Sequence, residues 1–170
     1  LLIPVIIRMA VFPFHFLFPD VVEGAPTTVS TYLAIVPIIA GVSIALKLCL
    51  NLFSVKAEFS WIHMPAFEWP TLVALLSVIT MTIGNLCALS QIKLKRLLAY
   101  STLAQVGYLF MGLAVSNHLG VGAVLFSLTI FCMITAGTFF IAQQAMDSQK
   151  TDSISALKGL VWKHPFAGVV

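Results

Sequence analysis

Residues 1–18, LLIPVIIRMAVFPFHFLF, are an apolar stretch in which Arg8 is the only residue of fixed charge. The next apolar stretch, residues 27–53, contains Pro37. A charge at the centre of a bilayer costs roughly 3 kcal/mol on insertion scales, so it persists where it faces protein or a wet cavity. A proline inside a membrane helix frees backbone groups that neighbours or water must satisfy. These features predict an ion-conducting membrane protein whose helix of residues 27–53 is interrupted or kinked at Pro37 and Ile38.

The composition is that of a polytopic membrane protein. Of the 170 residues, 60% are hydrophobic and 9% are charged, whereas roughly a quarter are charged in soluble domains. The net charge of +3 is small and dispersed, so it does not suggest a nucleic-acid partner, and none is expected. The cysteines Cys49, Cys87 and Cys132 lie far apart in apolar stretches, as is typical of buried apolar side chains. We expect an internal part of a longer protein, because the chain begins and ends within apolar stretches.

The length of the apolar stretches predicts an all-α fold, a transmembrane helix bundle forming a single, incomplete domain over residues 1–170. A spanning helix needs about 20 residues. Stretches of that length occur at roughly 1–18, 27–53, 70–91, 94–115 and 119–146, and another starts at 165. Small residues within them predict close helix contacts; they are Gly84, Ser101, Gly107, Gly112, Gly120, Gly122 and Gly137.

Loop charges predict the orientation of the bundle. With five crossings, loops 19–26, 91–96 and 147–163 lie on one side of the membrane. Basic residues gather on that side, namely Lys93, Lys95, Arg96, Lys150, Lys158 and Lys163, whereas the other side has only Lys56. Because basic loops stay on the side of synthesis, the first side is predicted to be cytoplasmic or matrix.

Candidate residues for an ion path are the polar groups inside or beside the spans. No Ser/His/Asp spacing, metal-ligand cluster, phosphate loop or dinucleotide fingerprint is present in the sequence. His15 follows Arg8 by seven residues, and histidine is the side chain type most often used to relay protons. The proton-path candidates are Arg8, His15, Lys47, Asn85, Lys93 and Lys95. The alternatives remain open, because a single histidine is more often packed, Lys47 can snorkel, and Lys93 and Lys95 suit a role as anchors.

Three strings resemble the antiporter-like membrane subunits of respiratory complex I. Residues 8–28, RMAVFPFHFLFPDVVEGAPTT, are similar to the pattern K-x-x-x-x-P-F-H-x-W-x-P-D-x-Y-x-G-A-P-T-P of that family. Residues 84–109, GNLCALSQIKLKRLLAYSTLAQVGYL, and the connector 157–166, LKGLVWKHPF, resemble two further family motifs. Their order and spacing resemble the subunit N (subunit 2) branch best, ahead of subunits M and L and of multisubunit cation/proton antiporters.

The resemblance implies an antiporter-like fold of inverted five-helix repeats, each with one discontinuous helix. It implies a part of a proton-translocating NADH:quinone oxidoreductase, with no redox or catalytic site in this chain. NAD, flavin, iron–sulfur clusters and quinone would be bound by other subunits. The implied partners are the other membrane-arm subunits, the lipid bilayer and protons. The implied location is a bacterial inner membrane, with mitochondrial inner and thylakoid membranes as alternatives.

The chain departs from the family at both relay lysines expected within it. The first aligns with Arg8, which stays protonated in essentially any protein site, and the second with Ile38, which carries no proton. Three interpretations follow. Water and hydroxyls near Ile38 could bridge the gap, Lys47 could substitute for the missing lysine, or the subunit could be structural with a fixed charge at Arg8. A subunit of a multisubunit cation/proton antiporter is the other alternative.

Overall fold

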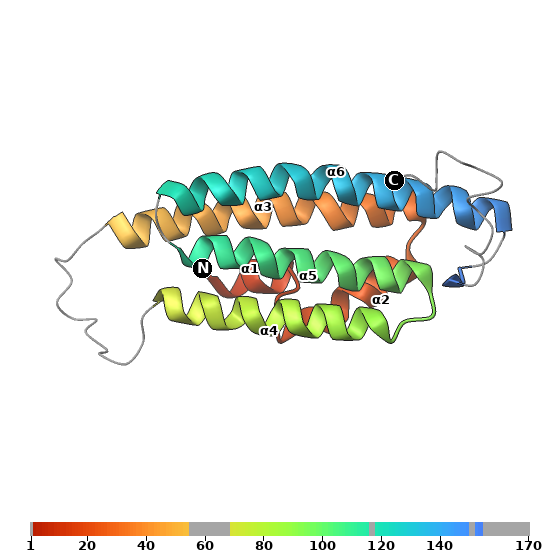
Figure 1. Cartoon of the computed structure of the whole chain (residues 1–170), viewed down its shortest axis with the longest axis horizontal. Helices are drawn as coiled ribbons and strands as arrows, with labels where there is room; N and C mark the ends of the chain where they lie inside the picture. Colours follow the sequence, from red (N-terminus) through yellow and green to blue (C-terminus); the bar gives the residue numbers. More distant parts are fainter. Residues whose placement is uncertain (1, 55–68, 116–117, 150–151, 155–170) are drawn as a thin grey trace.

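The computed structural model describes residues 2–54, 69–115, 118–149 and 152–154, and they fold as a bundle of helices (Figure 1). The elements are α1 Leu2–Arg8, a 3-10 turn η1 Phe14–Phe16, α2 Leu17–Gly24, α3 Thr27–Ser54, α4 Trp69–Leu89, α5 Leu94–Ala114 and α6 His118–Gln149. The described residues contain one isolated β-bridge, Lys93 with Ser153, and no strand. Helices α3 to α6 are each long and apolar enough to cross a bilayer. The predicted all-α transmembrane bundle is confirmed, whereas the apolar segment from residue 165 and most of the loop before α4 lie outside the described residues.

The predicted single helix over residues 1–18 is wrong, because the chain breaks after α1. The N–H of Val11 donates to the carbonyl of Ile6 at 3.1 Å, and the N–H of Ala10 donates to the carbonyl of Ile7 at 3.0 Å. Ala10 has a φ of 52°. Together these form a Schellman motif, in which a left-handed residue ends the helix and its last carbonyls are satisfied. Helix α1 therefore ends at Arg8, although the left-handed position carries alanine and not the glycine that usually marks such an end in a sequence.

The proline at position 13 keeps the chain from returning to a helix at once. The residue before a proline is disfavoured in the α conformation, so Phe12 stays outside both helices. The backbone N–H of Phe12 instead donates to the hydroxyl of Thr80 on α4 at 3.3 Å, which ties the break to the second layer of the bundle. The helical turn η1 and then α2 follow. The discontinuous helix of this fold is therefore the segment of residues 2–24.

Helix α3 runs without a break through Pro37, so the interruption predicted at Pro37 and Ile38 is wrong, and the alternative of a kink there stays a prediction. Packing compensates for the one hydrogen bond that the proline removes. One face of α3 is almost fully buried against its neighbours, and the residues on it are Ala34, Ile38, Val42 and Ala45. Because they follow the helical period, the whole length around Pro37 is held against the core.

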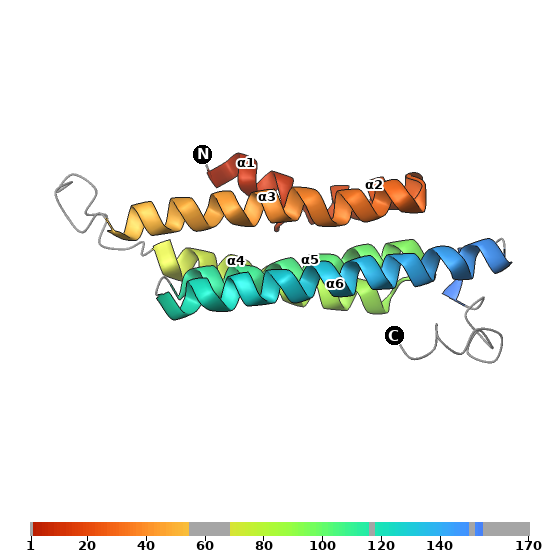
Figure 2. The ribbon, with the colours of Figure 1, turned by 90° about the horizontal axis from the view of Figure 1, so that it is seen from above.

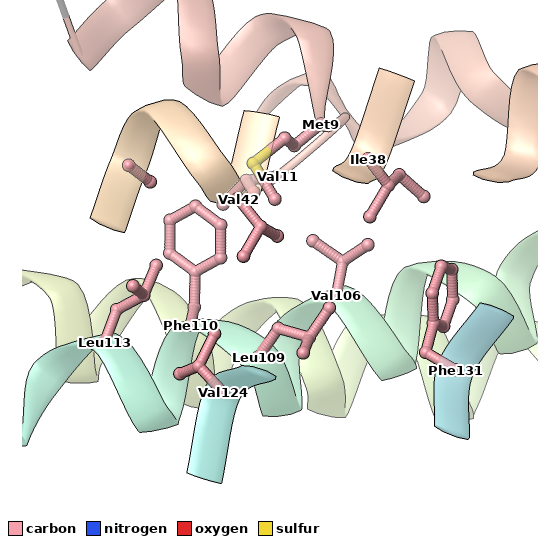
Figure 3. Packing of buried hydrophobic residues seen from close by; sticks show 11 residues of the cluster. Met9, Val11, Ile38, Val42, Val106, Leu109, Phe110, Leu113, Val124 and Phe131 are labelled. Atoms are coloured by element: carbon pink, nitrogen blue, oxygen red, sulfur yellow. The ribbon is translucent and has the colours of Figure 1, made fainter. Parts of the chain in front are cut away.

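The helices form two layers. Figure 2 shows α1, α2 and α3 in one layer and α4, α5 and α6 in the other. The main apolar cluster lies between the layers, where Ile38 and Val42 of α3 meet Val106 and Phe110 of α5, with Phe131 of α6 beside them (Figure 3). A second cluster lies near the other end of α3, and it comprises Val22, Ala34, Ala99 and Phe139.

Small residues bring α4 and α5 into close contact, as predicted. A Cβ at Gly107 would lie 2.8 Å from the backbone nitrogen of Met81, and one at Gly84 would lie 2.8 Å from that of Ala104. The hydroxyl of Ser77 donates to the carbonyl of Gly107 at 2.7 Å across the same contact. Gly112 and Gly120 lie at similarly close contacts near the α5–α6 junction, whereas nothing would lie within 4 Å of a Cβ at Gly122. Ser101 is exposed, so it does not mediate such a contact.

The loops that were predicted to share one side meet at one end of the bundle (Figure 1). The N–H of Leu94 donates to the carbonyl of Asp152 at 3.0 Å, and the N–H of Ile154 donates to that of Ile92 at 3.1 Å. The side chain of Lys93 reaches Glu23, which joins the third loop to this junction. The described parts of the three loops therefore share one end, whereas Lys150, Lys158 and Lys163 lie outside the described residues. The cytoplasmic or matrix orientation of that end stays a prediction.

Candidate ion path at the discontinuous helix

Arg8 is the last residue of α1, and its exposed side chain lines a cavity of about 230 Å³. The walls come from α1, the break, α2 and α3, through Ile7, Arg8, Ala10, Leu17, Phe18, Val21, Leu33 and Pro37. All these residues except Arg8 have apolar side chains. The guanidinium therefore faces a cavity, as expected of a charge at this place in an apolar stretch.

The end of α1 is an electrostatically favourable place for this cation. The C-terminus of a helix carries a partial negative charge, which stabilises a nearby cation by about 0.3–1 kcal/mol at exposed sites. Arg8 is the basic residue of the last turn of α1. The same geometry is available to a lysine, so the dipole accounts for a cation here but not for the choice of arginine.

Pro37 gives the opposite wall of the cavity a backbone acceptor. A helical residue normally donates its N–H to the carbonyl four residues earlier, and proline has no N–H. The carbonyl of Leu33 consequently lacks its usual partner at Pro37, and both residues line the cavity of Arg8. Arg8, Leu33 and Pro37 thus line one cavity, in which a guanidinium donor and a backbone acceptor could both hydrogen-bond to water.

His15 lies beyond the break, in η1, and is not among the residues that line this cavity. Its ring stacks on Phe12 with centroids 5.7 Å apart and meets Phe16 edge-on at 6.2 Å. Its Nδ1 is buried without a hydrogen-bond partner among the residues that the structure describes. The structure therefore places the His15 ring against two phenylalanine rings, and its role as a proton relay stays a prediction.

The structure separates Ile38 from Lys47. Ile38 is 2% exposed and packs in the apolar cluster, where Figure 3 shows its side chain directed toward α5. Lys47 follows by nine residues, and at about 100° per residue it lies on the opposite face of α3. Its side chain is exposed. Lys47 is thus badly placed to replace a lysine at position 38, and the apolar side chains around Ile38 offer water no partners.

The remaining candidates lie in two other places. The Asn85 amide Nδ2 of α4 donates to the Tyr108 hydroxyl of α5 at 3.3 Å. Lys93 binds the carboxylate of Glu23, and Lys95 Nζ donates to the carbonyl of Ala25 at 3.0 Å. The six predicted residues are therefore not gathered into one site, and Lys93 and Lys95 lie at the loop junction.

Sequence reasoning missed the acidic partners at this junction. Asp20 binds Arg96, and Arg96 Nε lies 2.8 Å from Glu23 Oε2 without the alignment of a hydrogen bond, so this second contact is ionic. The Lys93 ammonium, helped by Arg96, holds the pKa of the Glu23 carboxyl below its ordinary value. The available signal was the opposite charge of two loops predicted to share a side.

These features define the class of the protein. Four apolar helices long enough to span a bilayer, together with a discontinuous helix whose first part ends on a cation, make it a multi-pass α-helical membrane protein. Residues 1–170 match the family model described as NADH:quinone oxidoreductase/Mrp antiporter, transmembrane. The chain belongs to that family, and with it to the multi-pass proteins of the inner membrane.

Curated relatives agree with the family. The chain is 37% identical over 160 residues to NADH-quinone oxidoreductase subunit N 2 of Chloroherpeton thalassium, covering 94% of the chain and 31% of the relative. It is 40% identical over 159 residues to subunit N of Magnetococcus marinus, covering 93% and 31%. It is 33% identical over 159 residues to NAD(P)H-quinone oxidoreductase subunit 2 of a Synechococcus strain, covering 94% and 29%. The chain spans about a third of the length of these relatives, and the predicted resemblance to the subunit N branch is confirmed.

Proposed function

We propose that this chain is part of a proton-translocating membrane subunit of a bacterial NADH-quinone oxidoreductase, in which Arg8 acts as a fixed positive charge beside the proton path. The supporting observation is the cavity that Arg8 shares with Leu33 and Pro37 of α3. An arginine at this position does not release its proton, so it acts through its field. The field favours the ionised form of neighbouring acids and repels an excess proton. Redox groups and quinone belong to other subunits of the complex.

Two of the three interpretations of the missing relay lysines place the proton path at α3, and the packing supports them less well. A water path through position 38 would have to cross the apolar cluster in which Ile38 is buried. A substitute at Lys47 would act from the opposite face of α3. A subunit of a cation/proton antiporter remains the second candidate, because the description of the family covers both kinds of protein. The relatives' names favour the oxidoreductase.

The test compares Arg8→Lys with Arg8→Met in the full-length subunit assembled in its complex. Arg8→Lys keeps the cation at the end of α1, so it should preserve or improve proton transfer. Arg8→Met removes the field, and we expect coupled proton uptake to fall about tenfold, which corresponds to about 1.4 kcal/mol. The measurement is the quinone reductase rate together with proton uptake in membranes, at matched levels of assembly.

Lys47→Met is the matched control, since it removes a cation from the exposed face of the neighbouring helix. We expect it to leave coupled proton uptake unchanged. Unchanged uptake in Arg8→Met would reduce Arg8 to a structural residue and support the scaffold interpretation. A loss in Lys47→Met as large as that in Arg8→Met would instead favour Lys47 as the relay.

A further inference from the structure

Ion pairs attach the short helix α2 to the turn between α4 and α5. On α2, Glu23 binds Lys93 and Asp20 binds Arg96, and Arg96 also lies 2.8 Å from Glu23. The Lys93 side chain is 57% exposed, whereas that of Glu23 is 25% exposed. An isolated exposed pair contributes little, but two acids and two bases that share partners form a network. We call these four residues the junction network.

Lys93 and Arg96, the basic half of the junction network, lie on backbone that hydrogen bonds from the segment after α6 hold in place. Helix α5 begins at Leu94 after Lys93, whose own side chain does not cap it. Asp152, from the segment after α6, supplies the cap instead. Its Oδ1 accepts the backbone N–H of Lys95 at 3.3 Å, and its carbonyl accepts that of Leu94 at 3.0 Å. A carboxylate at a helix N-terminus is stabilising, so α5 presents its cations from a rigid start.

Asp20 and Glu23, the acidic half of the network, lie on the short helix α2, which depends on its neighbours for stability. Helix α2 has eight residues, too few to be stable alone in water. Its buried residues are Pro19 and Val22, and the carbonyl of Val22 accepts a hydrogen bond from the Ser30 hydroxyl at 2.9 Å. The cavity of Arg8 is lined from α2 by Leu17, Phe18 and Val21. Any displacement of α2 therefore moves one wall of that cavity.

We propose that Lys93 and Arg96 are positioning residues, which fix α2 through Glu23 and Asp20 and thereby set the cavity wall that faces Arg8. This inference rests on the proposed function of the Arg8 cavity. It assigns the basic turn 91–96 a role across the bundle, in place of one within the proton path.

The ion pairs of the junction network stay formed near neutral pH. The lowered pKa of Glu23, caused first by Lys93, means that the carboxylate stays ionised above that value. A depressed carboxyl pKa contributes stability that is present above the unfolded value and is lost as the pH falls through the folded one. The other charges facing Glu23 are Arg96, which acts with Lys93, and Asp20, which opposes them weakly. The attachment of α2 should therefore hold at neutral pH and loosen only in acid.

The test uses thiol labelling of the full-length subunit assembled in its complex, with its native cysteines replaced by alanine. Val21→Cys places the reporter at a position that lines the cavity and is 52% exposed, and Val29→Cys, at a position of α3 that is 45% exposed, is the matched control. In Lys93→Glu we expect a water-soluble thiol reagent to label Cys at position 21 about fivefold faster, as the loss of a partly exposed network allows. Labelling at position 29 should not change.

The charge swap of the whole junction network, Asp20→Lys and Glu23→Lys with Lys93→Glu and Arg96→Glu, separates pairing from a mere loss of folding, because every contact then still joins opposite charges. It should return both the labelling rate and coupled proton uptake toward those of the parent protein. If Lys93→Glu prevents assembly, the same comparison is made with Lys93→Gln. The ratio of labelling at position 21 to that at position 29 should be constant near neutral pH and rise in acid.

The outcomes separate this inference from the proposed function. The positioning role of the junction network is overturned if the labelling rate at position 21 is the same in Lys93→Glu as in the parent protein. It is also overturned if the charge swap fails to restore that rate. Labelling that responds and is restored, while proton uptake stays unchanged in every variant, upholds the attachment of α2 and overturns the proposed function of the cavity. Restoration of both upholds both.

Discussion

The two proline-containing apolar segments of this chain behave in opposite ways. Residues 2–24 break into two short helices around a left-handed Ala10, whereas α3 continues through Pro37 as one helix of 28 residues. The first segment has lost its helix where the backbone turns, and its free N–H at Phe12 is satisfied by Thr80. A proline alone therefore does not determine where a membrane helix is interrupted.

The difference follows from what each segment packs against. The face of α3 around Pro37 is buried between α1, α5 and α6. The free-energy cost of one missing hydrogen bond is therefore small compared with the packing that α3 would lose if the helix broke there. The first segment buries Met9 and Val11 within the break itself, and these residues are 1% and 0% exposed. Its break is therefore stabilised by the same apolar core that keeps α3 intact.

The largest expected effect comes from placing a charge on the intact helix. The family resemblance implies a lysine where this chain has Ile38. Because Ile38 packs among apolar side chains between the two layers, Ile38→Lys should destabilise the subunit by roughly 3 kcal/mol or more. The measurement is the amount of assembled subunit in membranes and the temperature at which it loses protease resistance.

Ile38→Met, which keeps a similar apolar volume, is the control and should cost less than about 1.5 kcal/mol. Normal assembly of Ile38→Lys with increased proton uptake would contradict the packing argument. It would show that water reaches position 38, and that α3 differs less from the discontinuous segment than the structure indicates.

A smaller effect is expected from removing the proline of α3. Pro37→Ala restores a backbone N–H for the carbonyl of Leu33 within a continuous helix, so we expect a gain of about 1–3 kcal/mol. Pro13→Ala should bring no such gain, because Pro13 lies in the break. The thermal midpoint of the full-length subunit in membranes measures both. A loss in Pro37→Ala would mean that the free carbonyl or the ring itself is needed in the cavity wall.

The sequence predicted the long helices well and the discontinuous one badly. Hydropathy placed α3 at 27–53 and α5 at 94–115, within one residue of their observed ends, because apolar length is what a spanning helix requires. The same signal merged α1, the break and η1 into one span. A Schellman ending usually carries glycine, and Ala10 gives no such sign.

The candidate site shows the same limit. Arg8 was identified from its own chemistry, since a charge in an apolar stretch needs a cavity. The partners of Lys93 and the cap from Asp152 depend on residues about 60 to 70 positions away in the chain. The opposite charges of two loops, and their prediction on the same side of the membrane, limit which residues can pair but do not identify the pairs. Contacts between residues this far apart in the chain therefore had to come from the structure.

The smallest expected effect tests the break itself. Ala10 adopts a left-handed φ of 52°, which costs an L-residue roughly 1–2 kcal/mol that glycine avoids. Ala10→Gly should therefore stabilise the discontinuous segment by about 0.5–1 kcal/mol, after the greater freedom of glycine in the unfolded chain is subtracted. Ala34→Gly, the same substitution at a buried site inside α3, should cost at least about 1 kcal/mol. Thermal midpoints of the two variants should thus move in opposite directions. Movement of both downward would show that Ala10 is held in a right-handed conformation and that the first segment, like α3, continues as a helix.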